Sequence, residues 1–164
     1  SKLETTEAAI KMQRRMAIRQ GVEEAINRMI EDMRRLVDQT NIAQSQMEEN
    51  QLNNLLGVAL ETPSVELVKL YIQYQVGRDL GGKNWRYANF GEQLVTELQK
   101  LKKEKAESIV NEVHKKMPDL AQPTQAEIDE VWLDLVRQYL GQLKRYVYYC
   151  KKVPLSARRS GHDS

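Results

Sequence analysis

The sequence is poor in cysteine, histidine, phenylalanine and proline, and it has no long hydrophobic run. Its 164 residues include one cysteine, one phenylalanine, two histidines and four prolines. The single cysteine, Cys150, excludes an internal disulfide framework and is typical of a reducing compartment. Because no run of 18 apolar residues occurs, we expect no membrane-spanning helix. The first twenty residues carry acids and lack an apolar core, so we expect no secretory signal and a cytoplasmic protein.

The usual combinations of catalytic and metal-binding residues are also missing. His114 and His162 lie far apart in the sequence. Glu112 and His114 are two residues apart, whereas a di-metal site in a helical bundle needs Glu-x-x-His pairs on facing helices. The segment DLGGKN lacks the spacing of a phosphate-binding glycine loop. A Cys150 nucleophile with a distant His114 base remains an alternative. We therefore expect a protein that is not an enzyme and that has no metal or cofactor.

Charge is distributed unevenly, although the net charge is only +2. Residues 1–66 hold eight Lys/Arg and eleven Asp/Glu, whereas residues 67–164 hold seventeen and twelve. From Arg137 to the end, seven basic residues accompany a single acid, Asp163. A basic end of this kind is typical of a surface that contacts a polyanion. The alternative is a solvated helix end, where lysines are favoured by the helix dipole.

The hydrophobic pattern predicts an all-α protein, a bundle of about five helices with a long N-terminal helix. Apolar residues recur at three- and four-residue spacing, and no stretch alternates as a strand does. We expect these helices over about 7–38, 47–60, 63–77, 89–117 and 124–153. Residues 1–153 are expected to form one domain, with N-terminal helices in 1–60 and core helices in 62–153. Residues 154–164 are expected to form a flexible, basic, disordered tail after Pro154.

Several residues predict where these helices begin and end. Thr6 can cap the first helix, and Pro63 suits the first position of the third. Gly77 can end the third helix in a left-handed conformation, before a turn that contains Gly81 and Gly82. Two pairs resemble capping boxes: Asn89 with Glu92, and Thr124 with Glu127.

Residues 70–92, LYIQYQVGRDLGGKNWRYANFGE, gather aromatic and basic residues around a glycine turn. They include three tyrosines, one tryptophan and the only phenylalanine. Guanidinium groups bind phosphates bidentately, and tyrosine or tryptophan faces can stack on unpaired bases. This turn and the basic last helix therefore predict a surface that contacts a nucleic-acid backbone. The candidate nucleic-acid-binding residues are Lys69, Arg78, Lys83, Arg86, Arg137, Lys144, Arg145, Lys151 and Lys152.

The aromatic residues have an alternative interpretation as packing groups with exposed polar tips. It applies to Tyr71, Tyr74 and Trp85, and we favour core packing for Tyr71 and Trp132. The last helix ends with three tyrosines that cannot all face one core, because residues one and three apart diverge around a helix. At least one of them is expected at a surface: Tyr146, Tyr148 or Tyr149.

The helix order, the segment YIQYQVGRD and the final helix WLDLVRQYLGQLKRYVYYCKK together resemble the small subunit of a CRISPR–Cas effector complex. The resemblance covers residues 62–153 and is to the helical small subunits of type III-A and type I-D complexes. In this family Arg78 would end the Gly-Arg segment, and the basic last helix would carry Lys144, Arg145, Lys151 and Lys152.

This resemblance implies a non-catalytic subunit of an RNA-guided complex of antiviral defence, packed in multiple copies along that complex. It implies contacts with backbone phosphates of the guide–target duplex or of a displaced single strand, so the bound strand is RNA or DNA. The implied partners are the guide RNA, the target or non-target strand, the large subunit, the backbone subunits and further copies of the chain. Base sequence would be read by the guide and not by this chain.

A helical scaffold or adaptor that binds only protein partners is the alternative function. The lysines would then be solvated, and the tyrosines would serve protein contacts. The first helix contains Met12, Met16, Met29 and Met33, and these methionines would offer a docking face for a partner helix. Core filling is the favoured interpretation of the same residues. A peripheral membrane binder fits less well, because the basic helices also carry acids and lack a strong apolar tip.

Overall fold

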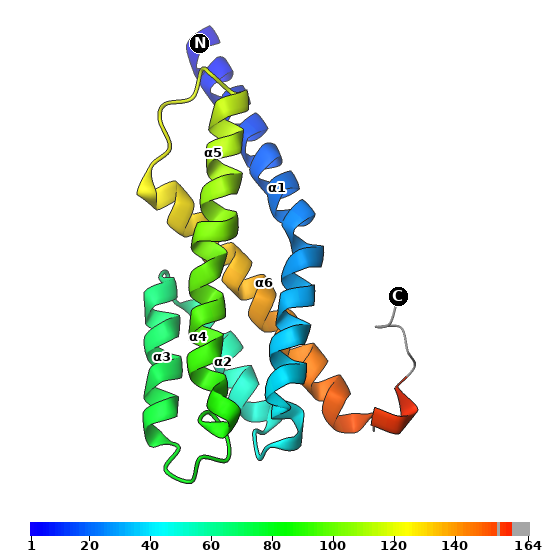
Figure 1. Ribbon diagram of the computed structural model, residues 1–164. Helices are drawn as coiled ribbons and strands as arrows, with labels where there is room; N and C mark the ends of the chain where they lie inside the picture. The colour runs from blue at the N-terminus through cyan, green and yellow to red at the C-terminus, as the bar shows by residue number, and fades with distance from the viewer. Residues whose placement is uncertain (154, 159–164) are drawn as a thin grey trace.

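The computed structural model describes residues 1–153 and 155–158, and within them every regular element is a helix (Figure 1). The π-helical turn Lys102–Ala106 joins α4 to α5, so these two helices form one continuous rod. The prediction of an all-α bundle of about five helices with a long N-terminal helix is therefore confirmed. The α-helices are α1 (Lys2–Thr40), α2 (Glu49–Glu61), α3 (Val65–Arg78), α4 (Phe90–Leu101), α5 (Glu107–Lys116) and α6 (Gln125–Lys152). Short 3₁₀ turns span Ile42–Gln44, Tyr87–Asn89 and Leu155–Ala157.

Helix α6 is the central packing element. It runs diagonally across the bundle and makes its most extensive contacts with α1 and α2 (Figure 1). The α4–α5 rod contacts α3 along its first half and α1 along its second half. One hydrophobic core joins these elements, and its fully buried side chains include Met29, Leu94 and Leu135. None of the helices within residues 1–153 and 155–158 is long and apolar enough to cross a membrane.

Two predicted core aromatics pack as expected. Trp132 is buried, and its indole N–H donates to the Leu98 carbonyl at 2.8 Å. This hydrogen bond satisfies the only polar atom of a large buried ring. Tyr71 is half-buried and packs against the same core. Core packing is therefore confirmed for both residues.

Helix α1 begins earlier than the sequence predicts. The Ser1 hydroxyl accepts a hydrogen bond from the Glu4 N–H at 3.3 Å, and the two residues form a capping box. Thr6 is not the cap, because it lies inside the helix and its hydroxyl donates to the Lys2 carbonyl at 2.8 Å. The prediction missed this start because residues 2–9 are exposed and carry little hydrophobic periodicity.

Helix α3 differs from the prediction at both ends. The Ser64 hydroxyl caps its start, so Pro63 precedes the helix instead of occupying its first position. Because the helix continues to Arg78, Gly77 is helical and does not form a left-handed cap. The left-handed glycine is Gly82, with a φ of 68°, in the turn that the sequence predicted.

Of the two predicted capping boxes, only the one at Thr124 has the side-chain hydrogen bond that caps the helix start. The Thr124 hydroxyl accepts from the Glu127 N–H at 3.2 Å and starts α6. Asn89 instead takes a left-handed φ of 58° and makes no side-chain cap to α4. The prediction of a box between Asn89 and Glu92 is therefore wrong.

The predicted tail falls partly outside the described residues, which omit 154 and 159–164. Within 155–158, the Arg158 guanidinium donates to the Cys150 carbonyl at 2.7 Å and to the Val153 carbonyl at 3.0 Å. These bonds tie this short segment to the end of α6.

Candidate nucleic-acid interface

The last turns of α6 present four predicted cations on one face. Lys144 and Lys151 are seven residues apart, and so are Arg145 and Lys152, so each pair repeats after two turns on the same side. Tyr148 lies among them and is 45% exposed. The opposite side of these turns is buried in the core. We call these five residues the basic face of α6.

The cations of the basic face have no carboxylate partner within residues 1–153 and 155–158. The sequence also contains no acid between Asp134 and the end of α6. The Lys152 ammonium lies 5.6 Å from the Tyr148 ring centroid, within the range of a cation–π interaction. Unneutralised cations beside an exposed aromatic ring can bind phosphates and support a stacked base.

Partly buried polar contacts fix this end of α6 to α1. The Tyr146 hydroxyl donates to the two carboxylate oxygens of Asp38 at 2.9 and 3.1 Å. Burial raises the pKa of Tyr146, and the hydrogen bond to Asp38 raises it further, so the phenol stays a neutral donor. Arg34 covers the ring, with its guanidinium carbon 5.5 Å from the centroid. Burial also raises the pKa of the Cys150 thiol beside it.

The three tyrosines at this end divide between core and surface. Tyr146 is buried, whereas Tyr148 and Tyr149 are exposed. The rings of Tyr146 and Tyr149 stack with centroids 6.3 Å apart, and Arg158 lies 5.9 Å from the Tyr149 ring centroid. The prediction that at least one of the three lies at a surface is confirmed.

Two other candidate cations, Arg137 and Arg86, donate hydrogen bonds to the last carbonyls of helices. The Arg137 guanidinium donates to the Ala59 carbonyl at 2.7 Å and to the Thr62 carbonyl at 3.1 Å, at the end of α2. The Arg86 guanidinium donates to the Val76 carbonyl at 2.7 Å, at the end of α3. The last carbonyls of a helix lack intrahelical donors, so each guanidinium stabilises the end that it fills. These contacts occupy donors that a phosphate would use, and phosphate binding by both residues stays a prediction.

Arg78 and Lys83 lie at the exposed end of α3 and in the following turn. The Arg78 guanidinium carbon is 5.4 Å from the Tyr74 ring centroid. Asp79 orders the turn by accepting backbone N–H bonds, including those of Lys83 and Arg86. Figure 1 places this end of α3 and the end of α6 on opposite sides of the molecule. The nine candidates therefore do not form a single surface.

Trp85 is not available for stacking on a base. It is buried, and its ring lies against Phe90 with centroids 6.3 Å apart. The packing interpretation is therefore right for Trp85. Only Tyr74 among the aromatics of α3 and the turn is an exposed large ring.

A groove between α3 and α4 joins Lys69 to two lysines that were not among the candidates. The Lys69 ammonium donates to the Gln99 side chain at 2.7 Å. Lys100, Lys103 and Gln73 line the same groove. Its volume is about 420 Å³. Lys103 belongs to the π-helical turn, which changes the direction of side chains relative to a regular helix. In the sequence, these lysines are visible only as the lysine-rich run at residues 100–105. Which of their side chains face the groove depends on the π-helical turn.

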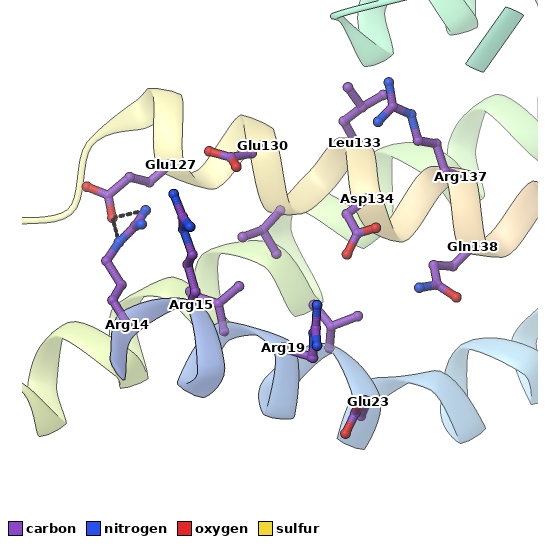
Figure 2. Close-up of a pocket in the computed structure, with 13 residues that line it drawn as sticks. Arg14, Arg15, Arg19, Glu23, Glu127, Glu130, Leu133, Asp134, Arg137 and Gln138 are labelled. Carbon is purple, nitrogen blue, oxygen red and sulfur yellow. Dashed lines mark hydrogen bonds and ion pairs between the residues drawn. The ribbon is translucent and has the colours of Figure 1, made fainter. Parts of the chain in front are cut away.

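A larger hollow between α1 and α6 is lined by opposite charges (Figure 2). Its volume is about 630 Å³. At one end the Arg14 guanidinium donates to the Glu127 carboxylate at 3.1 and 3.2 Å. Arg15 and Arg19 extend from α1 toward α6, which presents Asp134. Burial raises the pKa of Asp134. Because carboxylates alternate with arginines here, the hollow suits a polyanion less well than the basic face does.

His114 belongs to a structural cluster and does not pair with Cys150. Its Nδ1 lies 2.6 Å from the Ala121 carbonyl, and its Nε2 lies 2.6 Å from the Glu127 carboxylate. Glu127 is in the first turn of α6, and Cys150 lies about 35 Å further along that helix at 1.5 Å per residue. The alternative of a thiol nucleophile with a His114 base is therefore excluded. The described ranges also contain no group of three His, Cys, Asp or Glu side chains that could hold a metal.

Comparisons with protein-family models, curated proteins and solved structures find no match to this chain. Its function is therefore inferred from the residues and the geometry described above.

Proposed function

We propose that the protein is a non-catalytic, nucleic-acid-binding small subunit of an RNA-guided CRISPR effector complex. In this proposal the basic face of α6 contacts the sugar-phosphate backbone of the guide–target duplex or of a displaced strand. The observation that carries it is a set of four cations around one exposed tyrosine on a single face of α6, with no carboxylate partner within residues 1–153 and 155–158.

The dimensions of the basic face suit a short stretch of backbone. From Lys144 to Lys152 the helix rises about 12 Å, at 1.5 Å per residue. Successive phosphates of one strand advance about 3.4 Å along the axis of a duplex, so a helix lying along that axis passes roughly three or four of them over this length. Contacts of this kind carry no base sequence, which agrees with a complex in which the guide reads the target.

The assignment to an effector complex rests on the resemblance of residues 62–153 to CRISPR small subunits. That resemblance is based on the helix order, the segment YIQYQVGRD and the basic, aromatic last helix, and every regular element within the described residues is a helix. The proposed partners are the guide RNA, a target or non-target strand, the large and backbone subunits and further copies of the chain.

The strand contact is tested by charge reversal of the basic face. A variant with glutamate at its four cations is expected to lose at least tenfold in affinity for single-stranded RNA or DNA, irrespective of sequence. A matched control reverses the charge of four exposed cations outside the basic face: Lys11, Arg28, Lys115 and Lys116. Like the basic face, this set has three lysines and one arginine, and two of its residues lie in the last turn of a helix. Equal affinities of the two variants, both folded by circular dichroism, would exclude the basic face as the binding surface.

Assembly into an effector complex is tested by co-expression. The untagged chain is expected to co-purify with tagged backbone subunits and a guide RNA. Retention of the chain only by an unrelated protein, with no nucleic acid present, would instead favour the adaptor function.

One observation favours a protein-contact function in addition. Met29 and Met33 are buried in the core, as the core-filling interpretation predicted, but Met12 and Met16 are exposed. The first turns of α1 therefore keep two apolar side chains that none of the other described residues covers.

A further inference from the structure

The hollow between α1 and α6 carries two arginines and two carboxylates that line the same space. On α1, Arg15 and Arg19 are one turn apart and extend toward α6 (Figure 2). On α6, Glu130 and Asp134 have the same spacing. All four side chains are exposed, and none forms an ion pair within residues 1–153 and 155–158. We call the first two the open arginines and the last two the open carboxylates.

Charges from both helices act on Asp134. Partial burial raises its pKa, the Arg137 and Arg19 charges lower it, and the Glu130 charge raises it again. Arg19 therefore acts on this carboxylate from across the hollow, and Glu130 repels it from one turn earlier on the same helix. A divalent cation at the two open carboxylates would remove this repulsion.

A metal ion alone has too few ligands in the hollow. In the part of the chain that the structure describes, no group of three His, Cys, Asp or Glu side chains could hold a metal. Mg²⁺ needs near-ideal octahedral geometry, and proteins usually bind it through one or two carboxylates together with water and the phosphates of a ligand. The open carboxylates meet this requirement only if the ligand brings its own oxygens.

A phosphate-bearing ligand alone also fits poorly. Guanidinium groups match phosphate oxygens well, so the open arginines suit such a ligand, but the open carboxylates repel it. A bound divalent cation would reverse the effect of the carboxylates and make them attract the phosphates through the metal. The hollow is lined by four arginines and four carboxylates, so its formal charge is zero: Arg14, Arg15, Arg19 and Arg137 with Glu23, Glu127, Glu130 and Asp134.

We propose that the hollow binds a diphosphate group together with a divalent cation. The open arginines are about 6 Å apart along α1, so each takes one phosphate, and the open carboxylates hold the cation directly or through its waters. Bridging of phosphate oxygens by Mg²⁺ is the usual arrangement in phosphoryl-transfer sites. The volume of about 630 Å³ lies within the range of small-ligand sites, and Ile18 and Val22 offer an apolar wall to the body of a nucleoside diphosphate. No residue of the basic face lines this hollow, so the inference goes beyond the proposed function.

Isothermal titration of the full chain with ADP tests this site. ADP with Mg²⁺ is expected to bind, whereas ADP with EDTA and AMP with Mg²⁺ are each expected to bind at least tenfold more weakly. Magnesium chloride alone should not bind. Inorganic pyrophosphate with Mg²⁺ separates two sources of the same chemistry. If it binds as tightly as ADP, the diphosphate group supplies the whole contact, and if ADP binds more tightly, the nucleoside adds to it.

Substitution of the open arginines tests the phosphate half of the site. Arg15→Gln with Arg19→Gln should weaken the binding of ADP with Mg²⁺ at least tenfold. Arg28→Gln with Arg35→Gln is the matched control, because it removes two exposed arginines of α1 that do not line the hollow. The control should bind as the wild type does. All four side chains are exposed, so circular dichroism should match the wild type for both variants.

Substitution of the open carboxylates tests the metal half and gives a readout that a structural role would not move. Glu130→Gln with Asp134→Asn should weaken binding at least tenfold in Mg²⁺ but should not weaken it in EDTA. The dependence on magnesium should therefore disappear in this variant. A variant that binds ADP as weakly in EDTA as in Mg²⁺ because it has unfolded is recognised by circular dichroism.

Three outcomes would overturn the inference: no binding of ADP or pyrophosphate with Mg²⁺ at millimolar concentration, equal binding with and without Mg²⁺, or equal binding by the wild type and both hollow variants. Loss of ADP binding in the charge-reversed basic face, with binding retained in the hollow variants, would also overturn it. Strand affinity is a separate readout. The hollow variants should bind single strands as the wild type does, so failure of either site leaves the other testable.

Discussion

Arginine side chains show how tertiary context decides the role of a residue. Arg137, Arg86 and Arg158 each direct a guanidinium to the last carbonyls of a helix, at the ends of α2, α3 and α6. A guanidinium offers five donors that match phosphate oxygens and clustered carbonyls alike. The sequence shows the charge of these residues, but only the fold shows that helix ends take up their donors.

The cap by Arg137 predicts a loss of stability on truncation. Arg137→Ala leaves carbonyls at the end of α2 without donors and should lower the free energy of unfolding by about 1–3 kcal/mol. Urea denaturation measures this difference. Arg145→Ala removes an exposed guanidinium that has no ion pair within the described residues, and it should change stability by less than about 0.5 kcal/mol. Equal effects of the two substitutions would contradict the capping role.

Tyr148 should contribute to strand binding through its ring. Stacking on a base is worth roughly 1–3 kcal/mol, so Tyr148→Ala should weaken single-strand binding by about tenfold or more. Tyr148→Phe keeps the ring and should bind nearly as well as the wild type. Fluorescence anisotropy with a labelled oligonucleotide distinguishes the two. If Tyr148→Phe binds as weakly as Tyr148→Ala, the hydroxyl rather than stacking is responsible.

Glu127 should make stability depend on pH. Burial raises its pKa, but the hydrogen bonds from His114 and Arg14 outweigh this and hold the pKa below the ordinary value of 4.5. A carboxyl with a lowered folded-state pKa stabilises the protein above its unfolded-state pKa, and this contribution is lost as pH falls through the folded value. Glu127→Gln should therefore lower the melting temperature at pH 7, and the difference from the wild type should shrink below about pH 4.5.

Thermal melts at a series of pH values measure this effect. Glu130→Gln is the matched control, because Glu130 is exposed one turn further along α6 and makes no ion pair within the described residues. It should leave the pH profile unchanged. A constant difference between Glu127→Gln and the wild type from pH 7 to pH 3 would argue against the cluster.

At the scale of elements, α6 combines a structural half and a basic half. Its first turns are capped by Thr124 and joined to α1 and α5 through Glu127, whereas its last turns carry the basic face. The sequence predicted the basic face, because helical periodicity alone puts residues seven apart on one side. It could not predict the π-helical turn after α4, since no single residue type specifies one.

Alanine substitutions at two helical glycines, Gly91 in α4 and Gly141 in α6, are expected to change stability in opposite directions. A Cβ at Gly91 would overlap the Val76 side chain and lie 3.0 Å from the Trp85 carbonyl. Gly91→Ala should therefore lower stability by about 1–3 kcal/mol. Gly141 in α6 has nothing within 4 Å of an added Cβ, so Gly141→Ala should raise stability by about 0.5–1 kcal/mol. Denaturant titration measures both, and a stabilised Gly91→Ala variant would contradict the close approach.

At the scale of the whole molecule, the sequence predicted the helices well and their arrangement poorly. Apolar periodicity predicted five helical segments, and the core packing expected for Tyr71 and Trp132 is present in the structure. Capping was less predictable, because Ser1 and Ser64 compete with neighbouring residues that are equally good caps. Arg78 is the last residue of α3, and the separation of this helix end from the end of α6 depends on how distant helices cross, which local patterns do not specify.

The central claim is that the basic face of α6 binds phosphates, and the salt dependence of strand affinity tests it most directly. Each phosphate contact on a single strand contributes about −0.7 to the slope of log affinity against log salt. Replacing Lys144, Arg145, Lys151 and Lys152 with alanine should therefore flatten the slope by about 3, whereas alanine at Lys11, Arg28, Lys115 and Lys116 should leave it unchanged. Identical slopes for the wild type and the basic-face variant would contradict the claim.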